Sequence, residues 1–130
     1  MSLILSSATN PGGATWSEGS GSATAQQVAI LNADVSIAPT ESTAYYATTS
    51  GSQVDVTLAN PVFAGQVVSI RFVSDAGQDV VITFPAALNS AGNTIATLND
   101  ANDSFGVIAV AVGLTSFRWV PLFNNGAVLS

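Results

Sequence analysis

The chain lacks the residues on which most catalytic and metal sites depend. Its 130 residues include no Cys, no His and no Lys, and its only basic side chains are Arg71 and Arg118. Without Cys there is no disulfide, no thiol nucleophile and no thiolate metal site. Without His the usual neutral-pH proton shuttle and the commonest metal ligand are missing. We therefore expect no enzymatic activity and no cofactor.

Charge is also scarce. Charged residues make up 8% of the chain and hydrophobic residues 48%, whereas an ordinary soluble domain is about 25% charged. Ser, Thr, Asn, Gln and Gly must therefore form most of the surface, and much apolar surface is left over. Because large exposed apolar areas usually mark interfaces, we expect partners to cover part of it, most simply other copies of the chain. The alternative is a neutral, hydroxyl-rich secreted domain.

The charge that is present argues against two classes of partner. With a net charge of −6 and a pI near 4.1, the chain would be repelled by phosphate backbones and by acidic bilayers. No run approaches the roughly 20 apolar residues of a membrane span. Residues 1–5 carry no positive charge and are too short for the apolar part of a signal peptide. We expect no nucleic-acid or membrane partner, and synthesis in a cytoplasm.

Residues 1–27 have the composition of an extended, flexible arm. Ser, Gly, Ala and Thr make up most of this segment, and such a composition cannot offset its ordering entropy by burying itself. Leu3, Ile4, Leu5 and Trp16 are the exceptions, and we interpret them as hydrophobic anchors that lie across a neighbouring subunit. The alternative is a frayed terminus.

Residues 28–130 are predicted to form one all-β domain. Val54, Val56 and Leu58 alternate with polar residues, as in a half-buried strand. Further short apolar runs are separated by turn signals, and there is no long amphipathic pattern. The spacing predicts a single antiparallel β-sandwich or barrel-like domain. The expected later strands cover residues 67–73, 80–84, 94–98, 105–112, 117–120 and 127–129.

The stretch 65–84 is predicted to be a β-hairpin, because two β-rich runs flank the polar turn 74–79. One face of this hairpin would build the core, and it consists of Val68, Ile70, Phe72, Val80, Ile82 and Phe84. The other face is too apolar for water and is our first candidate for a subunit interface, consisting of Val67, Arg71, Val73 and Val81.

The acidic residues offer little chemistry. Asp75 and Asp79 stand at the two ends of one predicted turn and could approach each other like a glycosidase pair. The segment 100–103 has oxygen ligands at short spacing, but it lacks the Gly, the length and the final Glu of an EF-hand loop. Asp in turns usually caps its own backbone, so we interpret these residues as turn formers and expect no metal site.

The aromatic residues allow two interpretations. Trp119, Phe117, Tyr45, Tyr46 and Trp16 could form a sugar-stacking platform, but such residues are more often core or interface anchors. Arg118 lies between Phe117 and Trp119 and must point opposite to them in a strand. We expect Arg118 and Arg71 to meet a carboxylate across an interface; the alternative is that both arginines are solvated.

The C-terminal part of the chain resembles small all-β domains of tailed-bacteriophage virions, found in head-decoration (cement) proteins, head fibres and some tail fibres. The resemblance covers about residues 54–130. It rests on the order of six short segments: 56–58, 64–70, 80–84, 102–105, 117–120 and 125–127. In the segment 102–105, Asn102 stands where the family pattern has Gly. It implies a homotrimer whose N-terminal segment contacts the shell, and it supplies no catalytic residues.

Together these observations predict a non-enzymatic virion structural protein. It would bind the outer surface of a phage capsid as a homotrimer, with the major capsid protein as its partner, and would stabilise the shell. Receptor or glycan binding by a head or tail fibre module is the alternative, and a secreted or surface-layer β-domain is a third possibility.

Overall fold

The computed structural model describes residues 26–130, with side chains from Leu31 onward. The predicted arm anchors Leu3, Ile4, Leu5 and Trp16 lie outside the described residues. The described part is all-β, which confirms the predicted fold class. Its strands are β2 (Gln26–Leu31), β3 (Val35–Ile37), β4 (Thr43–Thr48), β5 (Val54–Leu58), β6 (Val67–Ser74), β7 (Val80–Thr83), β8 (Ile95–Leu98), β9 (Ser104–Ala111), β10 (Phe117–Asn125) and β11 (Val128–Leu129).

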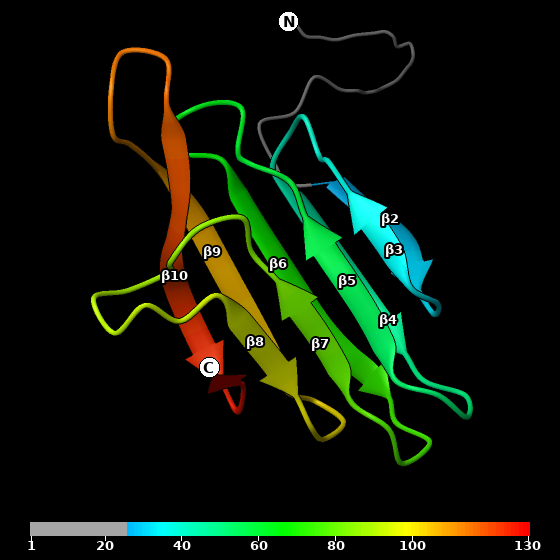
Figure 1. Cartoon of the computed structure of the whole chain (residues 1–130). Coiled ribbons are helices and arrows are strands. Elements are labelled where there is room, and N and C mark those ends of the chain that lie inside the picture. Colours follow the sequence, from blue (N-terminus) through cyan, green and yellow to red (C-terminus); the bar gives the residue numbers. More distant parts are fainter. Residues whose placement is uncertain (1–25) are drawn as a thin grey trace, which may run out of the picture.

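The strands form two sheets that pack face to face and do not close into a barrel (Figure 1). One sheet has the order β10-β9-β6-β4-β2, and we call it sheet I. The other has the order β11-β8-β7-β5-β3, and we call it sheet II. From β2 to β7 the chain changes sheet after every strand, so it coils around the space between the two sheets.

This coiling makes the sheets mixed, and the predicted antiparallel pairing is wrong for the N-terminal half. In sheet I, β2, β4 and β6 run parallel. In sheet II, β3, β5 and β7 run parallel as well. Only the C-terminal strands pair antiparallel. In sheet I, β9 pairs with β6 and β10 pairs with β9. In sheet II, β8 pairs with β7 and β11 pairs with β8. A connection that crosses to the opposite sheet and returns brings the next strand back in the same direction, which is why the pairing is parallel.

The predicted hairpin over residues 65–84 is also wrong. The strands fall where the sequence placed them, but β6 lies in sheet I and β7 in sheet II. The turn 75–79 therefore spans the gap between the sheets. A hairpin joins two strands of one sheet, whereas the turn 75–79 joins strands of two facing sheets. Both show the same period-two alternation, because in both cases the apolar face of each strand points to the core.

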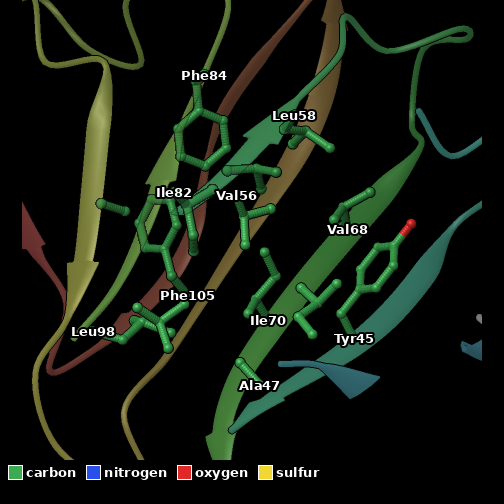
Figure 2. Packing of buried hydrophobic residues seen from close by; sticks show 14 of the residues in the cluster. Tyr45, Ala47, Val56, Leu58, Val68, Ile70, Ile82, Phe84, Leu98 and Phe105 are labelled. Carbon is green, nitrogen blue, oxygen red and sulfur yellow. The ribbon is translucent and has the colours of Figure 1, made fainter. Parts of the chain in front are cut away.

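The core lies between the sheets, and both sheets contribute to it (Figure 2). Strand β5 alternates buried and exposed residues along its whole length, as predicted for a half-buried strand. The six residues predicted for the core face of 65–84 are all buried. Phe84, just after β7, and Phe105 of β9 meet edge to face with their ring centroids 5.8 Å apart, a favoured arrangement for aromatic pairs.

A buried glutamine organises the connection between β5 and β6. Gln66 has no solvent exposure. Its Oε1 accepts a hydrogen bond from the Val62 N–H at 2.8 Å, and its Nε2 donates to the carbonyls of Pro39 at 2.9 Å and Glu41 at 3.1 Å. One side chain thus satisfies backbone groups of two connections that lie at the same end of the sandwich.

We predict that Gln66→Met lowers the free energy of unfolding by about 2–3 kcal/mol. Met has a similar length but cannot form the three hydrogen bonds of the buried amide, and each such bond contributes roughly 0.5–1.5 kcal/mol. Urea denaturation followed by circular dichroism measures the change. Gln53→Met, at an exposed position, is the matched control and should change stability by less than about 0.5 kcal/mol. Equal effects of the two variants would contradict this role of Gln66.

The parallel pairing of β5 with β7 can be tested with cysteines, since the chain has none. Asp55 and Val81 are register partners on the outer surface of sheet II. Their Cα atoms should lie roughly 5 Å apart, within disulfide range. We predict that Asp55→Cys with Val81→Cys forms an intramolecular disulfide under mild oxidation, detected by mass spectrometry.

The pair Val73→Cys with Val81→Cys is the control for this cross-linking experiment. A hairpin over residues 65–84 would place these two positions together, whereas the two-sheet fold places them on strands of different sheets. We expect no intramolecular disulfide in this pair. A cross-link between positions 73 and 81, without one between 55 and 81, would overturn the topology.

Candidate interaction surface

The outer surface of sheet I is the strongest candidate for an interaction site. Its side chains belong to positions that alternate with the buried core residues of β4, β6, β9 and β10. We define face I as this surface. Among the residues with described side chains, face I consists of Ala44, Tyr46, Val67, Ser69, Arg71, Val73, Ser104, Ile108, Val110, Arg118, Val120, Phe123 and Asn125.

An apolar row crosses face I. Val120 of β10 is opposite Ile108 of β9, and Ile108 is opposite Val67 of β6. All three are half-buried in the single chain. Val110, one step along β9 on the same face, is 37% exposed. Neighbouring side chains on one sheet face contact each other directly, so the row is a continuous apolar strip.

Both basic residues of the chain lie on face I. Arg118 is opposite Val110, and Arg71 lies between Tyr46 of β4 and Ser104 of β9. Both arginines are exposed. Arg71 Nη2 donates a hydrogen bond to Asn102 Oδ1 at 2.8 Å. Asn102 has a φ of 78°, a left-handed conformation that Asn tolerates better than most residues. This contact orients the guanidinium and leaves several of its donors available.

A groove of about 540 Å³ runs over face I beside Arg71. Its outward-pointing lining comes from β4, β6, β9 and β10, and comprises Ala44, Tyr46, Ser69, Arg71, Val73, Ser104 and Phe123. The ring of Phe123 lies over Gly106, where a Cβ atom would overlap it. Glycine at this position therefore lets the Phe123 ring lie directly against the backbone and form one wall of the groove.

The outer surface of sheet II is chemically different. We call it face II. Its central strands present Asp55, Thr57 and Thr83, which are exposed, and Val81, which is half-buried. The register Asp55↔Val81 and Thr57↔Thr83 sets these residues side by side. Face II is therefore the more polar of the two outer surfaces at its centre.

The structure divides the predicted interface residues between the two faces. Val67, Arg71, Val73 and Arg118 share face I, whereas Val81 lies on face II. The expectation that Val81 and Arg71 belong to one surface is therefore wrong. It followed from the hairpin prediction, which would have placed β6 and β7 next to each other in one sheet.

Two aromatic candidates for a sugar platform are excluded by burial. Trp119 is only 2% exposed, and its Nε1 donates to the carbonyl of Ala59 at 2.9 Å. Tyr45 is 9% exposed, and burial raises the pKa of its hydroxyl above the ordinary 10.0. Tyr46 points the other way, into the groove. Sequence reasoning missed Ile108, Val120 and Phe123, because only the strand register shows that they extend the face of Val67.

The predicted role of the turn carboxylates is confirmed for Asp75 and Asp103. Asp75 accepts a hydrogen bond from the Gly77 N–H in its own turn. Asp34 instead accepts one from the Asp55 N–H of β5, so it links two segments. Asp103 Oδ2 accepts from the N–H groups of Asn99 and Asp100, both at 3.0 Å. Within residues 26–130, no three His, Cys, Asp or Glu residues are grouped so as to hold a metal ion. The same part of the chain has no helix with the length and apolar character of a membrane span.

Comparison with known proteins does not assign the chain to a family. No model of a known protein family matches it, and no curated protein matches it either.

We predict a coupling between Gly106 and Phe123. Gly106→Ala should push the Phe123 ring out of the groove and lower the free energy of unfolding by about 1 kcal/mol, since overpacking typically costs 1–3 kcal/mol and the exposed ring can move. In a Phe123→Ala background the same change should cost nothing or stabilise the strand, because Gly weakens strand interiors. A double-mutant cycle by urea denaturation measures this, and strict additivity would contradict it.

Proposed function

We propose that the protein is a non-enzymatic virion structural protein that binds the outer surface of a phage capsid as a homotrimer and stabilises the shell. Face I carries the proposal. It combines the apolar strip of Val67, Ile108 and Val120 with Arg71 and Arg118. Such a strip on an otherwise charge-poor chain favours burial against another protein surface.

Symmetry favours the use of face I rather than both faces for the trimer. Faces I and II lie on opposite sides of the sandwich. If face I of one copy packed flat on face II of the next, the copies would stack into an open filament. Such a head-to-tail contact forms a closed ring only when the rotation between neighbouring copies adds up to a full turn. A closed trimer is formed when face I and the flanking β10 edge of each copy surround the axis. Val81 on face II is then solvent-facing.

Arg71 can contribute a directional contact to this interface. Its guanidinium is held by Asn102 and lies close to the turn that carries Asp100 and Asp103. A neighbouring copy that presents a carboxylate of this turn would give a charge-assisted hydrogen bond. Such bonds are about twice as strong as neutral ones and fix geometry.

The proposed mechanism is mechanical. Three equivalent attachments on one trimer act at a high effective concentration, so the combined binding is much tighter than one contact. A trimer that binds only the expanded lattice stabilises that lattice by mass action. Neither step needs a reactive side chain, which agrees with the absence of His, Cys and Lys.

We predict that the purified chain has three times its 13.1 kDa mass in solution, measured by analytical ultracentrifugation. Ile108→Asp should weaken the trimer at least tenfold, about 1.4 kcal/mol, because it buries an unpaired charge, while circular dichroism stays unchanged. Val81→Asp is the matched control on face II and should leave the trimer intact. A monomeric wild-type chain, or dissociation by Val81→Asp alone, would contradict the use of face I.

Shell binding is tested separately. The wild-type trimer should co-sediment with expanded, empty heads made from the major capsid protein encoded in the same genome, without added metal or cofactor. Unexpanded heads are the control and should bind little. A trimer that does not bind expanded heads would refute the decoration role and leave the trimer standing.

A second candidate function is receptor or glycan binding, which the groove on face I favours. Tyr46 and Phe123 supply aromatic surfaces, and Arg71 with Ser69 and Ser104 supplies hydrogen-bond groups. Ring stacking together with a few polar contacts is how proteins hold sugars. In this case Tyr46→Ala would abolish binding to cells or glycan arrays and leave assembly unchanged.

A further inference from the structure

Exposed apolar side chains gather at one end of the sandwich. Val62 and Phe63, on the connection between β5 and β6, are 49% and 41% exposed. Val112 and Leu114, at the turn between β9 and β10, are 56% exposed and fully exposed. We call these four residues the apolar end. Large apolar side chains at loop tips gain nothing from such exposure in the isolated chain.

Hydrogen bonds place the two loops of the apolar end side by side. The Gly65 N–H donates to the Ala109 carbonyl at 2.9 Å, and the Ala109 N–H donates to the Gln66 carbonyl at 2.8 Å. Trp119 Nε1 holds the Ala59 carbonyl. The connection 59–66 is therefore fastened to the strands that carry the β9–β10 turn, and both project from the same end (Figure 1).

Most acidic residues lie at the opposite end. The turns 49–53 and 75–79 contact each other through Gly51 N–H to Gln78 Oε1 and Ala76 N–H to Thr49 Oγ1, both at 2.9 Å. The turn 99–103 lies against the end of β6 that leads into the turn 75–79, through the Asn102 N–H, which donates to the Phe72 carbonyl at 2.7 Å. This acidic end carries Asp34, Asp55, Asp75, Asp79, Asp100 and Asp103. Of the described acidic residues only Glu41 lies at the end of Val62 and Phe63, on the connection that precedes β4, which Gln66 links to the connection 59–66.

The chain outside the described residues begins at the apolar end. Gln26, the first residue of β2, pairs with Thr43, and Thr43 pairs with Val68 at the start of β6. The preceding 25 residues therefore join the sandwich next to the connection 59–66. They contain Leu3, Ile4, Leu5 and Trp16 and no basic residue. A chain of 25 residues spans at most roughly 90 Å, which sets the limit on the surface within its reach.

We propose that the apolar end is the surface that docks onto the capsid shell, with the acidic end facing solvent. This rests on the proposed function and names which part of the molecule meets the major capsid protein. A trimer whose axis runs along the strands presents three apolar ends on one side and three acidic ends on the other. The partner is an uncharged, apolar patch repeated on a protein lattice, because a loop tip such as Leu114 needs a pocket that is free of charge.

Charge favours a protein lattice over a lipid surface. A lipid surface usually recruits proteins through basic residues, and the apolar end has only Arg118 at its margin. A lattice offers room for the loop tips and for the N-terminal segments on the same side.

The test uses the full-length trimer with Leu114→Asp, and Val128→Asp as the matched control. Val128 is also exposed, at 53%, but lies on β11 away from the apolar end. The probes are expanded empty heads and neutral phosphatidylcholine vesicles, both measured by co-sedimentation. We expect Leu114→Asp to lower head binding at least tenfold with the trimer unchanged, and Val128→Asp to bind like the wild type.

Three results would overturn the docking assignment. The first is head binding at the wild-type level by both the Leu114→Asp and the Val112→Asp variants. Circular dichroism and sedimentation first establish that each variant is folded and trimeric. Vesicle binding that Leu114→Asp abolishes would identify a lipid partner instead. Concentration-dependent pairing of trimers that Leu114→Asp abolishes would identify a second trimer. Failure of the wild-type trimer to bind heads would refute the proposed function itself.

Discussion

The structure depends on the apolar contact between its two sheets. Nearly every inward position of β4 to β9 is buried, and Phe84 meets Phe105 across the gap. Because the chain changes sheet after each strand from β2 to β7, neither sheet can exist without the other. The hydrophobic effect is the dominant favourable term in folding, and here it acts between segments that alternate along the sequence. The fold is therefore held by one shared core.

This shared core also decides what remains outside. Each strand offers alternate positions to solvent, and the two outer faces differ in composition. Face I combines the apolar strip with both arginines, while the centre of face II is polar. The strand ends add a second asymmetry, with exposed apolar loops at one end and most carboxylates at the other. A chain so poor in charge thus separates its surface into regions of different chemical character.

Much of the local structure could be predicted. The alternation of Val54, Val56 and Leu58, and of Val68, Ile70 and Phe72, correctly indicated which side chains enter the core. The turn roles of Asp75 and Asp103 followed from their sequence context. The candidate surface was predicted only in part: Val67, Arg71 and Val73 share one face, but Val81 lies on the other, and Ile108, Val120 and Phe123 were not foreseen.

The sequence by itself determined the all-β class, the approximate positions of the strands from β5 onward, their inward residues and the scarcity of reactive groups. Only the tertiary structure decided which strands pair, and hence that β6 and β7 belong to different sheets. The physical reason is that period-two alternation specifies which way a side chain points relative to the core, and it carries no information about the neighbouring strand. A surface built across four strands, such as face I, depends on register between distant segments and appears only when the chain has folded.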